Sequence, residues 1–135
     1  MKLPPDVLFH DDINLFVWRP LGVVNEAAVN KILTFLAKKE ATSRQPFNRF
    51  TDLSAQDEME LSFNYVFHVA LFRRLTYIRR PPVRSAFYVT NPEVAHLVKI
   101  HAIMTDHSPL QVEMFEERED AANWLGVSID CLEME

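Results

Sequence analysis

The chain has 135 residues, of which 48% are hydrophobic and 24% are charged, with a formal net charge of −5. This balance is typical of a globular domain, and the negative charge argues against general nucleic-acid binding, which needs a cationic surface. No apolar run approaches the ~20 residues of a membrane-spanning helix. The single cysteine, Cys131, excludes an internal disulfide. Together with a start that lacks the apolar core of a signal peptide, it predicts a cytoplasmic protein.

The N-terminal part of the chain predicts a hairpin followed by a helix. Residues 7–10 and 13–18 are apolar-rich runs on either side of an acidic pair, a pattern typical of two antiparallel strands. Asn25 is a suitable N-cap for a helix over residues 26–39, where apolar residues recur at spacings of three and four. A polar linker at residues 41–46 follows.

The remainder of the chain alternates strands with helices. We expect strands at 47–53, 83–90 and 110–115, and helices at 62–76, 92–105 and 118–125. Asn91-Pro92 is a typical helix start, and Gly126 a typical helix end. Residues 1–127 are expected to form a single domain, with residues 128–135 as an acidic tail. This order predicts an α/β fold with a mixed, mainly parallel sheet of about five strands, an N-terminal antiparallel hairpin and four helices.

Three short motifs, taken with this element order, resemble the SpoIIAA-like fold of anti-anti-sigma factors and STAS domains. They are RFTDLS at a strand end, LS before the next helix, and VEMFEEREDAANWLG near the C-terminus. The last of them resembles a group of small, mostly uncharacterised bacterial STAS-like proteins. Those proteins carry V-x-x-F in the last strand and A-x-x-W-L in the last helix, here Val112, Phe115, Ala121, Trp124 and Leu125. The resemblance covers nearly the whole chain and implies a βα superhelix without a bound cofactor. Packing motifs indicate a fold better than a function.

Ser62 is a weak candidate phosphoacceptor that follows from this resemblance. Anti-anti-sigma factors carry Asp-Leu-Ser-Gly at a strand end and then Asp-Ser-Ser-Gly at a helix start, where the second serine is phosphorylated. Counting without gaps from the DLS of residues 52–54 places that serine at Ser62. The local sequence ELSF departs from the motif, because Phe63 replaces the glycine. A helix N-terminus stabilises a phosphate, but serine is equally a common N-cap, and the cap is the favoured interpretation.

The helix at 62–76 has apolar residues on two sides. One broad stripe is expected to face the core and contains Phe63, Val66, Phe67, Ala70 and Leu71. Roughly opposite, where a surface helix is normally polar, lie Tyr65, Val69 and Phe72. Other parts of the chain, a homodimer or protein partner, or a small apolar ligand would each explain this second stripe.

Charge is unevenly distributed along the sequence. Residues 61–92 contain five arginines and no acid, whereas residues 113–135 contain eight acids and one base. Two solvated faces of opposite sign explain this pattern, and so does a basic patch for an anionic partner or matching between protomers. Because arginine is enriched at interfaces, we add Arg73, Arg79 and Arg80 to the expected partner surface.

No pattern in the sequence indicates catalysis or metal binding. The five histidines include no His-x-x-x-His pair on one helix. Gly22 and Gly126 are the only glycines, which excludes a phosphate-binding glycine loop. Cys131 has no neighbouring histidine to act as a base. The sequence therefore predicts a protein that is not an enzyme and holds no cofactor or metal.

Two functions remain open at this point. The first is a non-catalytic STAS-like module that works by protein–protein contact, expected as a homodimer or with a regulatory protein partner. The second is a binding protein for a small apolar or anionic ligand, held between the helices that follow the third and fourth strands. In that case His68 or His101 would supply the polar contact, although His101 on an apolar stripe is also typical of a hydrogen-bonded core histidine.

Overall fold

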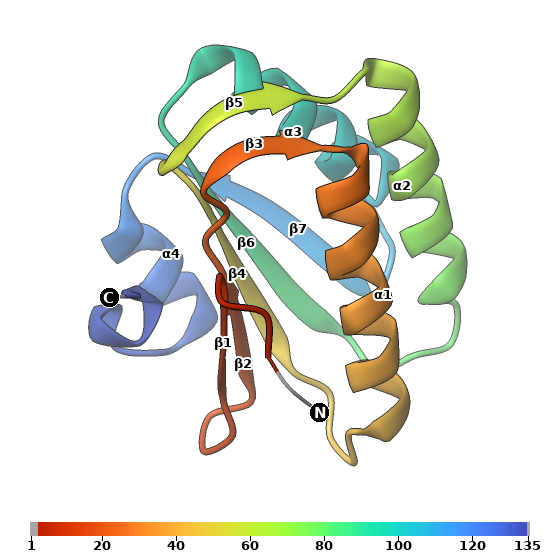
Figure 1. Cartoon of the computed structure of the whole chain (residues 1–135). Coiled ribbons are helices and arrows are strands. Elements are labelled where there is room, and N and C mark those ends of the chain that lie inside the picture. The colour runs from red at the N-terminus through yellow and green to blue at the C-terminus, as the bar shows by residue number, and fades with distance from the viewer. Residues whose placement is uncertain (1–2, 135) are drawn as a thin grey trace.

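A five-stranded sheet lies at the centre of the computed structural model, which describes residues 3–134 (Figure 1). The strand order is β1-β2-β4-β6-β7, where β1 pairs antiparallel with β2 and the other neighbours are parallel. The strands are β1 (Val7–His10), β2 (Leu15–Trp18), β4 (Asn48–Leu53), β6 (Val83–Val89) and β7 (Leu110–Phe115). The predicted mixed sheet with its N-terminal hairpin is therefore confirmed.

Helices cover both faces of this sheet. On one face lie α1 (Glu26–Thr42), α2 (Phe63–Thr76) and α3 (Pro92–Met104), and on the other lie α4 (Arg118–Leu125) and the 3-10 helix η1 (Ile129–Leu132) (Figure 1). Strand alternation divides the core accordingly, because Phe16 packs with α1 while its neighbour Val17 packs with α4. None of the helices within residues 3–134 is long and apolar enough to cross a membrane.

Helices α1, α3 and α4 begin at the residues that the sequence predicts, and α2 begins one residue later, with Ser62 as its N-cap. The side chain of Asn25 accepts a hydrogen bond from the Ala28 amide at 3.0 Å, and Asn91 accepts one from the Glu93 amide at 2.8 Å. Gly126 ends α4 with φ at 74°, a left-handed conformation that glycine adopts without strain. Side-chain caps thus mark the starts of α1 and α3.

Two short strands were not predicted. β3 (Gly22–Asn25) and β5 (Gln56–Glu60) pair in parallel as a separate two-stranded sheet beside the N-terminal ends of α1 and α2 (Figure 1). β5 has the sequence QDEME, which lacks the apolar alternation that identifies a strand. Its strand conformation comes from pairing with β3 rather than from its own side chains.

The segment expected to be an acidic tail packs onto the sheet instead. Leu132 of η1 is only 1% exposed and belongs to the cluster around Phe50 on the α4 face. The imidazole of His10 donates from Nε2 to the carbonyl oxygen of Cys131 at 2.8 Å. Acidic residues in this segment obscured the apolar positions that anchor it.

Candidate functional site

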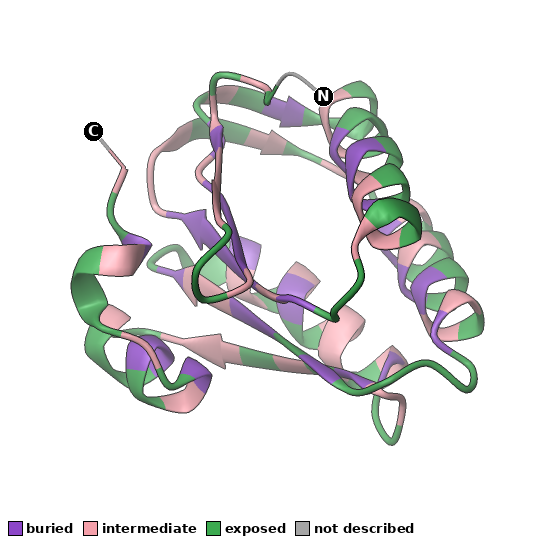
Figure 2. Ribbon diagram, turned by 90° about the horizontal axis from the view of Figure 1, so that it is seen from below, coloured by how far each residue is buried: buried purple, intermediate pink, exposed green. Residues whose placement is uncertain are grey.

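The inner side of α2 contains charge where the helical wheel predicted only apolar packing. Val66, Ala70 and Arg73 are its buried residues, and Tyr65 and Val69 are half-buried beside them. Other parts of the same chain therefore cover much of Tyr65 and Val69, which is one of the three explanations that the sequence left open for this stripe. Figure 2 shows the buried positions of the long helices on the side that faces the rest of the molecule. Apolar residues lie on more than one side of α2, so their spacing is a weak guide to its rotation. The buried Arg73 marks the side that faces the core.

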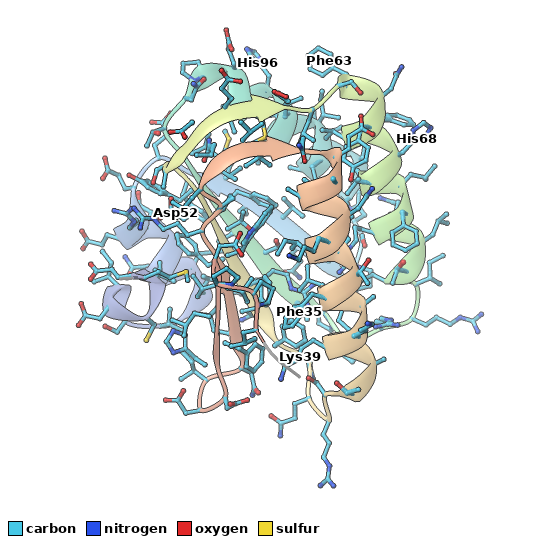
Figure 3. The ribbon with its side chains drawn as sticks, viewed as in Figure 1. Phe35, Lys39, Asp52, Phe63, His68 and His96 are labelled. Atoms are coloured by element: carbon cyan, nitrogen blue, oxygen red, sulfur yellow. The ribbon has the colours of Figure 1, made fainter. Side chains whose placement is uncertain are left out.

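The outer side of α2 is exposed and apolar, and we call it the outer strip. Its large side chains are Phe63 (61% exposed), Phe67 (44%), Leu71 (38%), Phe72 (54%), Leu75 (58%) and Ile78 just after the helix (59%). Phe63, Phe67 and Leu71 were expected in the core, so their placement corrects the sequence prediction, whereas Phe72 is exposed as expected. Figure 3 shows Phe63 and His68 pointing away from the body of the protein.

The size of the outer strip makes it a candidate interaction surface. Full burial of one large apolar side chain contributes about 1.5–3 kcal/mol, and single exposed apolar residues are common on protein surfaces. A continuous row along one helix is different, because patches of this kind mark interaction sites. Of the predicted partner residues, Arg79 and Arg80 are exposed at the C-terminal end of the strip, whereas Arg73 is buried.

Arg73 is buried because it belongs to an ion cluster beneath α2. The carboxylate of Glu40 accepts from Arg73 Nη2 at 2.7 Å and from Arg49 Nη1 at 3.0 Å, and Tyr77 Oη also donates to it. Burial favours a raised pKa for Glu40, but hydrogen bonding and charge from Arg73, with help from Tyr77 and Arg49, hold that pKa below its usual value. Two guanidinium groups thus share one carboxylate, and Arg49 Nε has no partner within the described residues.

A cavity of about 150 Å³ lies between the sheet and helices α1, α2 and α3. Its walls are almost entirely apolar and include Leu36 of α1, Val69 of α2 and Leu97 of α3. The polar residues at its wall include Arg49 and Arg73 of the ion cluster, together with Thr51, Ser85, Tyr65 and His101. The cavity therefore combines an apolar body with a positively charged end.

His101 is the histidine that faces this cavity. Its ring packs edge-on against Phe87 with 5.7 Å between the ring centroids. Burial, together with the positive charge of Arg73, lowers the pKa of His101 to about 4, so the imidazole is neutral at pH 7. The other proposed pocket residue, His68, is exposed on α2 and does not line the cavity.

Tyr65 closes the gap between α1 and α2 at one end of the cavity. Its hydroxyl donates to Asn30 Oδ1 at 2.5 Å and lies 3.3 Å from the carbonyl oxygen of Glu26. Burial and the nearby Glu26 carboxylate raise the pKa of this phenol. The residue predicted as part of a partner surface therefore links two helices of its own chain.

Ser62 is the N-cap of α2. Its Oγ accepts a hydrogen bond from the Tyr65 amide at 3.1 Å, as the cap interpretation predicts. Ser62 is itself exposed, and the bulky Phe63 beside it is exposed as well. Phosphorylation of Ser62 stays a prediction.

Sequence reasoning missed a buried carboxylate, Asp52, at the end of β4. Asp52 is 1% exposed and accepts hydrogen bonds from the Ser54 amide at 3.0 Å and from Arg118 Nη2 at 3.0 Å (Figure 3). Arg19 Nε lies 3.6 Å from the same carboxylate. The DLS motif that carried the family resemblance thus ends β4 in an ion cluster that ties it to α4.

Within the described part of the chain, no three histidine, cysteine or acidic side chains are grouped closely enough to hold a metal ion. The buried charges are used in pairing instead. Glu40 and Asp52 each form ion pairs with arginines, and buried carboxylates in folded proteins are usually paired in this way.

Comparison with known proteins identifies the architecture. No protein-family model matches the chain, and no curated protein matches it. Among solved structures it is similar to an uncharacterised protein of the DUF3478 family from Shewanella loihica PV-4, which is described as having a SpoIIAA-like fold. The TM-score is 0.57 at 17% sequence identity, covering 88% of this chain and 90% of the other. The chain has a SpoIIAA-like fold.

This SpoIIAA-like fold confirms the resemblance inferred from element order and from the C-terminal motif. At such low sequence identity the likeness is one of fold alone, and a fold of this kind hosts different functions. The outer strip and the cavity are the features of this chain that bear on its function.

Proposed function

We propose that this SpoIIAA-like protein is a non-catalytic module that binds another protein chain through the outer strip of α2, with self-association as the expected form. The single observation that carries the proposal is the row of exposed large apolar side chains from Phe63 to Ile78. A partner that covers these side chains removes their apolar surface from water, which stabilises the complex. Location in the bacterial cytoplasm stays a prediction from the sequence.

The test is the mass of the chain in solution, measured by size-exclusion chromatography with light scattering. We expect a dimer for the unsubstituted chain and a monomer for Phe67→Glu, which places a charge in the middle of the strip. Leu21→Glu is the matched control, because Leu21 is 64% exposed but precedes β3 rather than belonging to the strip. A chain that stays monomeric at every concentration contradicts the proposal. Circular dichroism would establish that both variants are folded.

The cavity supports a second candidate function, the binding of a small ligand. A cavity of about 150 Å³ is large enough for a benzene-sized group. The excess of guanidinium groups over carboxylates in the cluster of Glu40, Arg49 and Arg73 favours an anionic group at that end. A small aromatic or aliphatic carboxylate combines both properties.

Benzoate is a suitable probe for this second function, with toluene for the apolar contribution alone. We expect benzoate to shift the amide resonances of α1, α2 and α3 in NMR spectra, more strongly than toluene does. Val69→Phe fills the cavity from α2 and should abolish the shifts. Equal shifts in Val69→Phe would show that benzoate binds elsewhere and would contradict this candidate.

A further inference from the structure

The two ends of the outer strip carry opposite charge, and this determines how a second copy of the chain fits. We propose that two copies pack their α2 helices antiparallel about a twofold axis near Leu71, so that the acidic β5 segment of each meets the arginine end of the other. This inference rests on the proposed function and specifies its partner and geometry.

The N-terminal end of the strip is acidic. Asp57, Glu58 and Glu60 of β5 are exposed, and they line the same groove as Phe63, together with Glu93 of α3. Within residues 3–134 none of these four carboxylates forms an ion pair. Their charge is therefore available to a partner.

The C-terminal end of the strip is basic. Arg79 and Arg80 follow α2 and are exposed, and in the described residues neither forms an ion pair with a carboxylate. Arg74 Nη1 donates to the carbonyl oxygens of Met104 and Asp106, which are neutral acceptors and leave the charge of Arg74 without a carboxylate partner in the part of the chain that the structure describes. The carboxylate of Asp106 lies 3.4 Å from His107 Nε2. Arg80 also stacks over Tyr77, with its Cζ 5.7 Å from the ring centroid. The positive charge at this end therefore comes from Arg74, Arg79 and Arg80, of which Arg79 and Arg80 are the exposed members.

Charge selects the antiparallel arrangement over the parallel one. In a twofold homodimer the same patch meets itself, so two outer strips either run side by side in one direction or run in opposite directions. The parallel arrangement would place acids against acids and arginines against arginines, with aligned helix dipoles that also repel. The antiparallel arrangement places β5 of one copy beside Arg79 and Arg80 of the other and opposes the two dipoles.

The outer strip is too small to form a stable dimer interface alone, so the charged segments at its two ends must contribute to the contact. α2 has 14 residues, so it is about 21 Å long and one helix wide. A stable interface removes about 800 Å² from water on each partner, which is more than one helix face supplies. The flanking β5 and the segment after α2 extend the contact, and they give it an apolar centre with a polar rim, as interfaces commonly have.

Cysteine cross-linking tests the orientation directly, in a Cys131→Ser background that removes the native thiol. With a short bismaleimide, Leu71→Cys should cross-link to itself, because it lies near the axis. Phe63→Cys and Ile78→Cys should each fail alone and should cross-link when the two variants are mixed. Efficient cross-linking of Phe63→Cys to itself would overturn the antiparallel arrangement while leaving the proposed association intact. Absence of any dimer would instead remove the proposed function.

Charge reversal tests the electrostatic argument. We expect Arg79→Glu combined with Arg80→Glu to weaken the dimer about tenfold, since each exposed pair contributes modestly and two ends are affected. In a parallel dimer the arginines of the two copies would face each other, and the substitutions would replace this repulsion by one between glutamates. The affinity would then stay the same, and that result would overturn the inference. Lys31→Glu with Lys38→Glu is the matched control, because it makes the same charge change on exposed positions of α1. Adding Asp57→Lys with Glu58→Lys on a second chain should restore a heterodimer.

Discussion

The two faces of the central sheet differ in how closely the helices pack against them. On the α4 face, Ala86, Ala121 and Ala122 are at most 2% exposed and bring helix and sheet into close contact. On the other face, α1 and α3 also pack against the sheet, but a cavity and the buried cluster around Glu40 lie among the sheet and the helices. Close packing is the more stabilising solution, whereas cavities and buried charges reduce stability. The α4 face is therefore expected to contribute more to stability, and the proposed binding sites both lie on the side of the sheet that α2 covers.

The largest expected effect is the loss of the buried carboxylate on the α2 face. Glu40→Gln leaves Arg49 and Arg73 without a charged partner, and breaking a buried pair in this way costs about 3–5 kcal/mol. Urea unfolding would measure this loss. Glu116→Gln is the control, since Glu116 is exposed and surface changes typically stay within about 0.5 kcal/mol. Equal stability of Glu40→Gln and the unsubstituted chain would show that this cluster is not a structural element.

Acid should lower the stability of the folded protein through His101 of α3, which lines the cavity. Its pKa is lowered from 6.5 to about 4 in the folded protein, so below pH 6.5 the unfolded chain binds a proton that the folded chain does not. Stability is therefore lost as the pH falls from 6.5 to about 4, by up to about 3 kcal/mol at about 1.4 kcal/mol per pKa unit.

The pH effect is isolated by comparing urea unfolding of His101→Gln with that of His107→Gln, because His107 is exposed. His101→Gln should flatten the pH dependence between 6.5 and 4, and His107→Gln should not. Below pH 4.5 the lowered pKa of Glu40 adds a further loss in both variants. Parallel pH profiles for the two variants would place His101 in contact with bulk water.

Substitutions at two neighbouring residues of β6, one on each face of the sheet, should have an intermediate effect on the free energy of unfolding. Ser85 lines the cavity, whereas Ala86 is fully buried against the α4 side. Ala86→Val should cost about 1–3 kcal/mol because the added methyl groups have no space. Ser85→Val extends into the cavity and should change the free energy of unfolding by less than about 0.5 kcal/mol. Equal costs for the two substitutions, measured by urea unfolding, would mean that both faces are equally full.

The smallest effect concerns the start of α2. Ser62→Ala removes the cap from the Tyr65 amide and should cost about 1 kcal/mol, whereas Ser62→Asp preserves a side-chain acceptor and should restore most of it. Thermal unfolding distinguishes the two. A cost for Ser62→Asp as large as that for Ser62→Ala would show that the capping bond does not stabilise α2.

Local signals in the sequence predicted most of the fold. Asn25, Ser62 and Asn91 start helices because their side chains accept backbone hydrogen bonds within the next turn, and that chemistry needs no tertiary context. The alternation in β6 and β7 likewise indicated strands with two different sides.

The unpredicted parts depend on contacts between distant residues. β5 is a strand only because β3 pairs with it, and its polar sequence gives no local sign of this. The rotation of α2 depends on Glu40, which lies 33 residues before Arg73 and makes burial of that arginine possible. Apolar spacing placed Val66 and Ala70 correctly in the core but added Phe63 and Phe67, which are exposed, and it assigned Tyr65 and Val69 to the partner surface.

Sedimentation equilibrium of the unsubstituted chain over a wide concentration series tests the central claim that the outer strip is an association surface. The account predicts a reversible equilibrium between one and two chain masses, and Phe67→Glu shifts it to one chain mass under the same conditions. A single chain mass for both proteins throughout the series, with both folded, would contradict the account.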